Sequence, residues 1–360
     1  HAVTILSYQP LALAEMQVEM QGIPSIALVG LELLPPKDPK EHLWPRQASQ
    51  RLHQLLPDVD IVHLHGVWES LLRVAANQSR RLGKPYIVTP HGMLEPWALS
   101  RKWFKKQIAL LIAYGRMIDA AAAIHFLNSV EFDIALPLRL SAPAVIIPNG
   151  VFLEEMSRPP EPADLRASHP RLPDKPYILF LGRLHYKKGL DFLADAFSIV
   201  ARALPDVQLV VVGPDDRERA PFEQRVRHAH LAERVHLLGP LYGAAKLAAY
   251  AGAACFCLPS RQEGFSMAIL EAMACGVPVV ISEACHFPEA TRAGAGYVVP
   301  LHVSAIADAL LAVLKDPQSK QRMGQAGRRL VSTRFTWPAI ARQHIEAYQV
   351  ALERQAQRRR

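Results

Sequence analysis

Cysteine is scarce in this sequence, which contains four in 360 residues. None of the four has metal-type spacing, and Cys255 and Cys257 lie within the apolar run AACFCLPS. Thiols in such runs are ordinary buried side chains. The scarcity argues against metal or redox chemistry and fits a reducing compartment.

Long apolar runs are also missing, because no stretch reaches the roughly 18 residues that a membrane-spanning helix needs. No secretory signal pattern is visible at the N-terminus, so we expect a cytoplasmic protein. The net charge of +8 and the pI of about 9.4 permit phosphates, anionic lipid surfaces or nucleic acid as partners. No nucleic-acid-binding motif supports the last of these, and we expect no such partner.

What the sequence does contain is a regular alternation of short β-branched runs with longer amphipathic segments, which is typical of parallel α/β sheets. At roughly 100–200 residues per domain, the length predicts two domains. We expect strands at 2–6, 25–30, 60–66, 85–92, 122–128, 144–150, 176–184, 208–213, 234–239, 254–260, 278–282 and 296–300. We expect helices between them, including 190–204, 222–232, 243–252, 266–275 and 304–315.

A proline-rich stretch, residues 151–176, divides the chain and argues against a regular element there. We therefore expect an N-terminal domain over 1–155, a linker over 156–176 and a C-terminal domain over 177–335. A helix over 336–360 would pack back toward the N-terminal domain. Two such open sheets would face each other and bind ligands at the carboxyl ends of their strands.

The first candidate site follows the strand ILFLGRL, where Gly182 and Arg183 precede the loop LHYKKGL. A guanidinium from Arg183, an ammonium from Lys188 and the N–H groups of the next helix would converge there. This combination suits an anion such as a diphosphate. A solvated basic turn is the alternative interpretation of this loop.

The second candidate site is the stretch PSRQEGFSMAILEAMACGVPVVIS, residues 259–282. Gly264 allows a close backbone approach, and Ser266 suits the N-cap of a helix whose first N–H groups attract anions. Glu263 lies in the loop before this helix, and Glu271 lies inside it at a different depth. Two such carboxylates can each accept hydrogen bonds from a polyol, such as a sugar and a ribose. The alternative is a loop glutamate and a surface glutamate without a ligand.

These residues carry a resemblance. EGFSMAILE resembles the E-x7-E motif of the retaining nucleotide-sugar glycosyltransferases of family 4, with Ser266 and Met267 in place of the usual Gly and Leu or Ile. FLGRLHYKKGLD is similar to the family's GRLxxxKG loop, and the likeness runs over about residues 1–350. HGMLEPWALSRKWFKK resembles a bacterial subgroup active in polysaccharide and lipopolysaccharide assembly. The other matching segments are TPHG (89–92), PNG (148–150), VVVGP (210–214) and AGAGYVVP (293–300).

The resemblance implies the GT-B fold, two facing Rossmann-like domains, and a role for each matching residue. Arg183 and Lys188 would stabilise the leaving diphosphate, and Glu263 and His91 would contact the donor sugar. No metal ligand or cofactor is implied, and His63 and His65 are expected to be structural. The implied donor-binding residues are Gly182, Gly264, Phe265, Ser266, Met267 and Glu271, the last holding the ribose hydroxyls.

Two features depart from this pattern or go beyond it. The opening HAVTILS resembles the family's second strand, so we expect its first strand and glycine-rich loop to be missing. In the segment 100–117, Arg101, Lys102, Lys105 and Lys106 are mixed with apolar residues. It fits either peripheral contact with an anionic membrane or an ordinary amphipathic helix.

The predicted function is metal-independent, retaining transfer of a hexose from a UDP- or GDP-linked sugar to a saccharide or lipid-linked acceptor. An epimerase of the same fold is a rival, but its acid–base carboxylates do not resemble the Glu263–Glu271 pattern. A non-catalytic nucleotide-sugar-binding remnant is a second rival, which donor turnover would distinguish. A nucleic-acid binder is a third, suggested by the pI alone.

Overall fold

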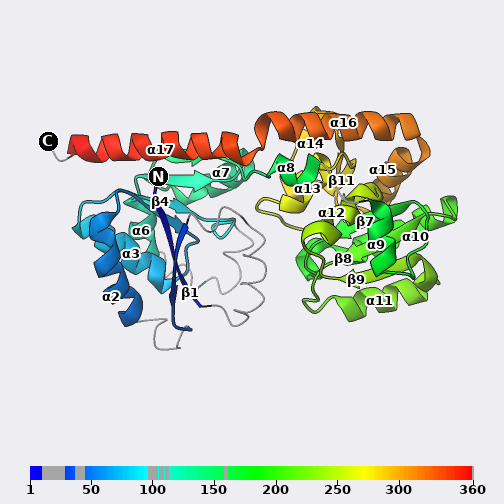
Figure 1. Ribbon diagram of the computed structural model, residues 1–360, viewed down its shortest axis with the longest axis horizontal. Helices are drawn as coiled ribbons and strands as arrows, with labels where there is room; N and C mark the ends of the chain where they lie inside the picture. Colours follow the sequence, from blue (N-terminus) through cyan, green and yellow to red (C-terminus); the bar gives the residue numbers. More distant parts are fainter. Residues whose placement is uncertain are drawn as a thin grey trace. The chain divides into compact units, whose positions relative to one another are not determined.

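The computed structural model describes residues 1–9, 29–36, 45–95, 104, 109, 113–157 and 161–358. They form two compact units (Figure 1). The first unit comprises residues 1–147 and 343–360, and the second unit comprises residues 148–342. The helix α17 (Trp337–Arg358) starts in the second unit and ends in the first.

The second unit contains one sheet of six strands, in the order β12-β11-β10-β7-β8-β9, and every neighbouring pair is parallel. Its strands are β7 (Tyr177–Leu181), β8 (Gln208–Val212), β9 (Val235–Gly239), β10 (Ala253–Leu258), β11 (Val279–Ser282) and β12 (Gly296–Val299). Its helices are α8 (Leu153–Ser157), α9 (Pro162–Ser168), α10 (Leu190–Ala203), α11 (Arg219–His228), α12 (Gly243–Ala251), α13 (Met267–Ala274), α14 (Glu289–Arg292), α15 (Val303–Lys315) and α16 (Pro317–Arg334).

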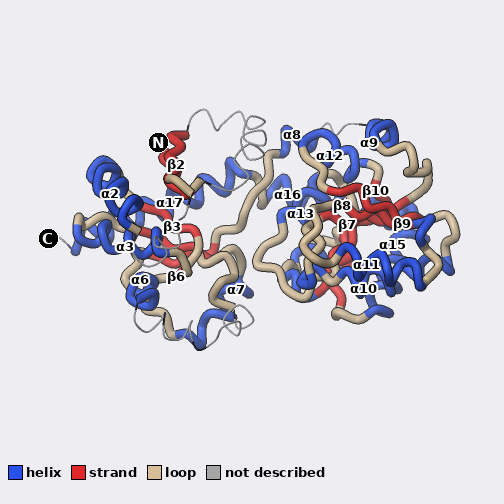
Figure 2. Tube along the Cα trace, turned by 90° about the horizontal axis from the view of Figure 1, so that it is seen from below, coloured by secondary structure: helices blue, strands red, loops and turns tan. Residues whose placement is uncertain are grey.

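The inner strands of the second unit are buried on both faces, because helices lie above and below the sheet (Figure 2). β8 is buried along its whole length, and β7 and β10 are buried at all but one end position. Parallel strands covered in this way read as continuous apolar runs, which is why ILFL, LVVV and ACFCL were recognisable in the sequence. All four cysteines are buried and free, as their apolar context predicted.

The first unit contains a parallel sheet in the order β3-β4-β5-β6 and a separate parallel pair, β1-β2. Its strands are β1 (Val3–Tyr8), β2 (Val29–Leu34), β3 (Val62–His65), β4 (Tyr86–Thr89), β5 (Ala123–Phe126) and β6 (Ala144–Ile146). Its helices, besides the end of α17, are α2 (Arg46–Leu55), α3 (Ser70–Arg81), α6 (Gly115–Asp119) and α7 (Ser129–Ala135).

Side chains of the four-stranded sheet alternate between two apolar layers, as the period of two in a strand requires. Tyr86 and Val88 of β4 pack in the layer formed with α2, α3 and α6. Ile87, between them, packs in the other layer with Ala123 and with Ala351 of α17. α17 therefore covers one face of this sheet, and the predicted α/β class with parallel sheets is confirmed.

The proline-rich stretch differs from the expectation that it holds no regular element. α8 and α9 lie within residues 151–176, and Leu165 and Leu172 are buried in the core of the second unit. Pro162 is the first residue of α9, a position where its missing N–H costs nothing. The expected linker over 156–176 therefore contains a helix and places Leu165 and Leu172 in the core of the second unit, although most of its described residues are exposed.

Two expectations fall partly outside the described residues. Residues 25–28 of the strand expected at 25–30 are not described, and β2 covers Val29–Leu34. Most of the basic segment 100–117 is also outside the description, including all four of its basic residues before 110. The missing first strand stays a prediction.

Candidate functional site

The order of the strands reverses between β7 and β10 in the second unit. From β7 the chain proceeds to β8 and β9 on one side, and from β10 it proceeds to β11 and β12 on the other. Open α/β sheets bind ligands outside the carboxyl ends of their strands at such a switch point. Gly182 follows β7 and Pro259 follows β10, so both predicted motifs leave the sheet there.

The structure brings Lys188 and Glu263 together at this switch point. Lys188 ends a short 3-10 turn after β7, and its Nζ lies 2.7 Å from Oε1 of Glu263, which follows β10. The hydroxyl of Ser260 donates to the same carboxylate oxygen. The Glu263 side chain is only 9% exposed and that of Lys188 is 19% exposed. A cation and a carboxylate are therefore held in a nearly closed environment between the two loops.

Arg183 has a different partner from the one that the anion-site interpretation suggested. Its Nη1 lies 2.9 Å from Oδ2 of Asp216, after β8, and the Arg183 side chain is 65% exposed. The structure thus places Arg183 in the loop after β7, as predicted, but pairs its guanidinium with a carboxylate of its own. Gly182 is next to Lys188, since a Cβ atom at residue 182 would contact the Lys188 side chain.

Glu271 is held by two residues of α12 that sequence reasoning missed. Nζ of Lys246 lies 2.9 Å from Oε1 of Glu271, and the hydroxyl of Tyr250 donates to Oε2 at 3.0 Å. Burial, followed by the charge of Glu271, raises the pKa of Tyr250 well above its ordinary value, so its hydroxyl stays a donor. Lys246 and Tyr250 lie four residues apart in the alanine-rich segment GAAKLAAYA, a spacing that puts both on one helix face. That spacing was the available signal.

The residues between the two glutamates form the start of α13. Ser266 is the N-cap residue, but its hydroxyl makes no capping hydrogen bond, contrary to the role that its position suggested. The Phe265 ring packs edge-on against Phe287, with centroids 6.1 Å apart. The backbone of 264–267, rather than these side chains, is therefore what this segment offers to a ligand. Met267 begins the helix, whose first N–H groups lack intrahelical acceptors.

His91 lies after β4 in the first unit, in a backbone conformation that few residues adopt. Its φ is 52°, in the left-handed region, where a non-glycine residue costs energy and often marks a functional site. Nε2 of His91 lies 3.0 Å from Nδ1 of His65. Desolvation of the ring, with His65 and His125 nearby, lowers the pKa of His91 to about 4, so it is a neutral hydrogen-bonding group at pH 7.

A buried carboxylate fixes the backbone beside His91, and sequence reasoning missed it. Oε1 of Glu131 accepts a hydrogen bond from the Gly92 N–H at 2.6 Å, and Oε2 accepts one from the Leu127 N–H at 2.8 Å. Glu131 also donates its own N–H to Asn128, the N-cap of α7. The Asn-x-x-Glu spacing of a capping box was its visible signal, although here the carboxylate bonds to other N–H groups.

A chain of hydrogen bonds lies behind His91 and His65. His63 bonds to the Tyr348 hydroxyl at 2.7 Å through Nδ1 and to the Thr89 hydroxyl at 2.6 Å through Nε2. The Thr89 hydroxyl also bonds to Nδ1 of His125 at 2.8 Å, and Nε2 of His125 bonds to the carbonyl oxygen of Ile147 at 2.6 Å. The His63 and His65 rings stack with centroids 4.4 Å apart.

In this chain of hydrogen bonds, the number of available protons determines which atom donates in each bond. The Ile147 carbonyl can only accept, so Nε2 of His125 carries the proton and Nδ1 accepts from Thr89. Thr89 has then used its proton, so it accepts from Nε2 of His63. Nδ1 of His63 in turn accepts from Tyr348. Neutral rings are required, and burial lowers the pKa of His63 to about 2 and that of His125 to about 4.

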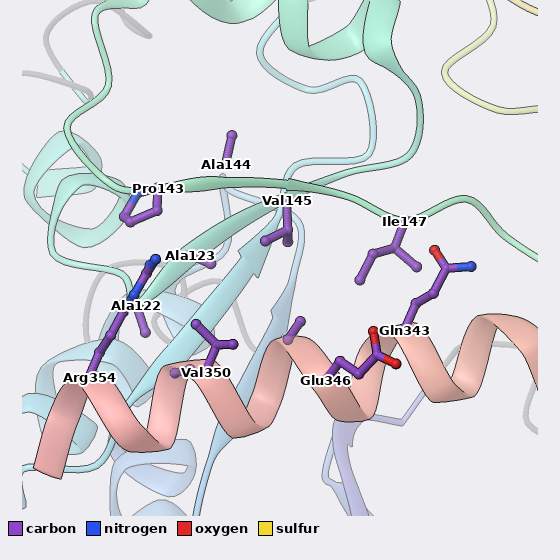
Figure 3. A pocket seen from close by; sticks show the side chains of 12 residues that line it. Ala122, Ala123, Pro143, Ala144, Val145, Ile147, Gln343, Glu346, Val350 and Arg354 are labelled. Atoms are coloured by element: carbon purple, nitrogen blue, oxygen red, sulfur yellow. The ribbon is translucent and has the colours of Figure 1, made fainter.

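A separate hollow of about 320 Å³ lies in the first unit between α17 and the strands β5 and β6 (Figure 3). Apolar side chains such as Val145 and Val350 line it, with Glu346 and Arg354 on the helix side. None of the predicted site residues lines this hollow, so it carries none of the predicted chemistry.

Comparison with known families covers most of the chain. Residues 163–330 match the family described as glycosyl transferases group 1, and residues 1–150 match the glycosyl transferase 4-like domain. The chain belongs to the glycosyl transferases group 1 family. The first match holds Lys188, Glu263 and Glu271, and the second holds His91.

Curated relatives of this group 1 chain match over about half of their own length. The phosphatidyl-myo-inositol mannosyltransferase of Mycobacterium leprae is 37% identical over 214 residues, which are 58% of this chain and 54% of the relative. A GDP-mannose-dependent monoacylated alpha-(1-6)-phosphatidylinositol monomannoside mannosyltransferase of Corynebacterium glutamicum is 31% identical over 204 residues, or 53% and 52% of the two chains.

Among solved structures, the Anabaena protein Alr3699/HepE in complex with UDP is similar to this group 1 chain. The TM-score is 0.77 at 19% identity, and the alignment covers 96% of this chain and 91% of the other. At that identity the likeness shows the fold, which is GT-B.

Two features are absent from the described residues. No helix among them is both long and apolar enough to cross a membrane. Within the same residues, no group of three or more His, Cys, Asp or Glu could hold a metal ion.

Proposed function

We propose that this chain transfers a hexose from a UDP- or GDP-linked sugar to a hydroxyl of a saccharide or lipid-linked acceptor, with retention of anomeric configuration. The observation that carries the proposal is the meeting of Lys188 and Glu263 at the switch point between β7 and β10. Membership of the group 1 family supports the same reading.

Charge development in the reaction explains why a lysine belongs there. The bond between the anomeric carbon and the departing diphosphate oxygen breaks, a bond to the acceptor oxygen forms, and the acceptor proton leaves with the phosphate. Negative charge grows on the diphosphate, and a preorganised cation favours that transition state over the ground state. Lys188 has three N–H donors, so it can keep Glu263 and still serve a phosphate oxygen.

Each of the remaining site residues would contact a different part of the nucleotide-sugar donor. Glu271, held by Lys246 and Tyr250, would accept hydrogen bonds from the ribose hydroxyls, and the start of α13 would offer N–H groups to sugar and phosphate. His91, neutral at pH 7, would hydrogen-bond a hydroxyl of the sugar. With Arg183 and Lys188 supplying positive charge, we propose that no divalent metal takes part.

The name of a relative and one basic segment support the proposed acceptor and cellular location. The Mycobacterium leprae relative is named for phosphatidyl-myo-inositol, which is a lipid. We therefore include a lipid-linked acceptor and peripheral work at the inner membrane surface in the proposal. The basic segment 100–117 would supply contact with anionic lipid.

The test is turnover of UDP-glucose and GDP-mannose, with and without EDTA, by the wild type, Lys188→Ala and Lys175→Ala. Lys175 is a matched control, because its Nζ makes an exposed ion pair at 2.9 Å with Asp206. The two residues precede β7 and β8, whereas both loops of the site follow the carboxyl ends of strands. We expect Lys188→Ala to lose on the order of 10²–10³ in rate and Lys175→Ala to keep it.

Proton NMR of the product would report the anomeric configuration, and retention with one of the donors is expected. Inversion, or a rate that EDTA abolishes, would contradict the corresponding part of the proposal. Nucleotide binding without any turnover would favour the non-catalytic binding protein instead.

A further inference from the structure

Arg261 lies in the loop after β10, and its side chain bonds to residues in and just after the loop that follows β7 and holds Lys188. Its Nη1 and Nη2 donate to Oδ1 and Oδ2 of Asp191 at 2.8 and 2.6 Å, a two-pronged pair that suits guanidinium geometry. The same Nη1 donates to the backbone carbonyl of Tyr186 at 2.9 Å. Asp191 lies in the first turn of α10, just after the loop.

Three further contacts connect Arg261 to residues on both sides of Lys188. Its guanidinium carbon lies 4.1 Å from the centroid of the Tyr186 ring and 4.8 Å from that of Phe192. The Arg261 backbone N–H donates to the carbonyl of Lys187 at 2.6 Å. Residues on both sides of Lys188 are thus attached to one residue of the opposite loop, through its side chain and its backbone N–H.

The backbones of the two loops also touch directly. Gly189 has a φ of +68°, and a Cβ atom there would overlap the carbonyl oxygen of Pro259. No ordinary side chain fits, so the loops approach as closely as backbones can. The contacts of Arg261, the Gly189–Pro259 approach and the Lys188–Glu263 pair make residues 186–191 and 259–263 one connected piece.

We propose that Arg261 is a positioning residue, which fixes the place of the Lys188 ammonium through the backbone of residues 186–189. This inference rests on the proposed function, in which Lys188 stabilises the departing diphosphate. Arg261 itself is not assigned to the phosphate, because both of its terminal nitrogens already donate to Asp191 and one of them also to the Tyr186 carbonyl. A misplacement of about 1 Å at a reacting group can cost about 10²-fold in rate, so such anchoring has a measurable consequence.

The deciding variants are Arg261→Lys and Arg234→Lys. Lysine keeps the charge but loses the two-pronged bond and the stacking on the ring. Arg234 is the matched control: its guanidinium donates to the carbonyls of Ala201, Leu204 and Val207 and lies 5.6 Å from the Phe197 ring. Like Arg261 it combines backbone-carbonyl hydrogen bonds with a ring contact in the same unit, but these contacts include no carboxylate and none of them reaches either loop.

Three measurements apply to each variant: hydrogen exchange of the peptide covering 183–189, calorimetric binding of UDP and GDP, and turnover of UDP-glucose and GDP-mannose. For Arg261→Lys we expect faster exchange in that peptide and a kcat about 10- to 100-fold lower, with a smaller change in KM. For Arg234→Lys we expect a lower melting temperature with exchange at 183–189 and kcat unchanged. A merely structural arginine would lower stability and leave kcat and loop exchange as they are.

Unchanged exchange and unchanged kcat in folded Arg261→Lys would overturn the inference. If Arg261→Lys does not fold, Asp191→Asn removes the charge of the partner with little change of shape and is judged by the same criteria. If the wild type neither binds nor turns over these nucleotides, the proposed function fails, and the exchange measurement alone still decides whether Arg261 positions the Lys188 loop.

Discussion

At the scale of single residues, Glu263 and Glu271 contact different side chains, although they lie only eight positions apart in the sequence. Glu263 faces Lys188 and Ser260 in the loops after β10 and β7, and Glu271 faces two residues of α12. Each carboxylate has one lysine of its own, so the two groups are not a shared acid–base pair. This arrangement suits two contacts with one extended ligand better than a proton relay between the glutamates.

Tyr250→Phe tests the second of these contacts, with Tyr177→Phe as its matched control. Both hydroxyls are buried and donate to backbone carbonyls, Tyr250 to Ala268 and Tyr177 to Ala249, but only Tyr250 also reaches Glu271. We expect each variant to lose about 0.5–1.5 kcal/mol of unfolding free energy. Only Tyr250→Phe should weaken nucleotide binding, by about tenfold, or about 1.4 kcal/mol.

Denaturant unfolding and UDP or GDP titration measure the two effects separately. Equal nucleotide affinity in both variants would show that the Tyr250 hydroxyl does not orient Glu271 for the ligand.

The residues of the site were predictable to different degrees. Lys188 and Glu263 stood out because glycine, basic and acidic residues cluster after apolar strands, where parallel sheets place ligands. The partner of Arg183 was not apparent from the sequence, since Asp216 follows a different strand, β8. Its pairing depends on how the loop after β8 folds back. The spacing of Lys246 and Tyr250 indicated a shared helix face but not its partner, because the approach of α12 to α13 is a tertiary contact that local sequence does not encode.

At the scale of elements, the strands of the second unit were predicted closely, because buried parallel strands are continuous apolar runs bounded by Gly or Pro. α9 was not predicted, since six prolines in 151–176 were taken as breakers. Proline breaks a helix interior but suits its first turn, and Pro162 is in that position. The first-unit pair β1-β2 was predicted only in part, because the strand expected at 25–30 overlaps β2 (Val29–Leu34) only at its last residues.

Gly189→Ala tests the contact between the two loops, and Gly294→Ala is its control. The two glycines have nearly equal φ values, +68° and +69°, but a Cβ atom at 294 would meet no atom within 4 Å. Gly294→Ala should therefore cost only the left-handed strain of about 1–2 kcal/mol. Gly189→Ala should cost about 1–3 kcal/mol more, because Pro259 must move.

Thermal and denaturant unfolding give these values, and nucleotide titration should show weaker binding for Gly189→Ala alone. Equal destabilisation by the two substitutions would mean that the close approach of Gly189 and Pro259 is not a constraint.

At the scale of the whole molecule, contacts between distant parts of the sequence determine what local patterns cannot. His63 and Tyr348 are 285 positions apart, and their hydrogen bond helps to hold α17 on the first sheet. Gln355 adds another such bond, to the Gly83 carbonyl. The sequence indicated that His63 was structural, but not that it joins a directed chain ending at Ile147.

The buried histidines of this hydrogen-bond chain predict how the stability of the first unit depends on pH. The pKa of His63 is about 2 and that of His125 about 4 in the folded state, against 6.5 for an ordinary histidine. As pH falls below about 6.5, the unfolded chain therefore binds protons that the folded chain does not, and stability decreases. Above that pH the two histidines contribute no pH dependence. For His125 alone we expect a loss of roughly 2 kcal/mol at about pH 4.5.

Denaturant unfolding at a series of pH values checks this on the wild type, His125→Gln and His228→Gln, the last being an exposed histidine of α11. The slope between about pH 6.5 and 4.5 should become shallower in His125→Gln and stay unchanged in His228→Gln. An unchanged slope in His125→Gln would contradict a neutral, buried His125.

The central claim is that the second unit binds a nucleoside diphosphate at the switch point without a metal. Calorimetric titration of UDP and GDP, in EDTA, into the wild type, Glu271→Ala and Glu223→Ala tests it most directly. Glu223 is the control, a carboxylate paired at 2.9 Å with Arg219 on α11. We predict that one nucleotide binds the wild type and Glu223→Ala alike, and binds Glu271→Ala at least about tenfold more weakly. A folded wild type that binds neither nucleotide, or equal binding by Glu271→Ala, would contradict the account.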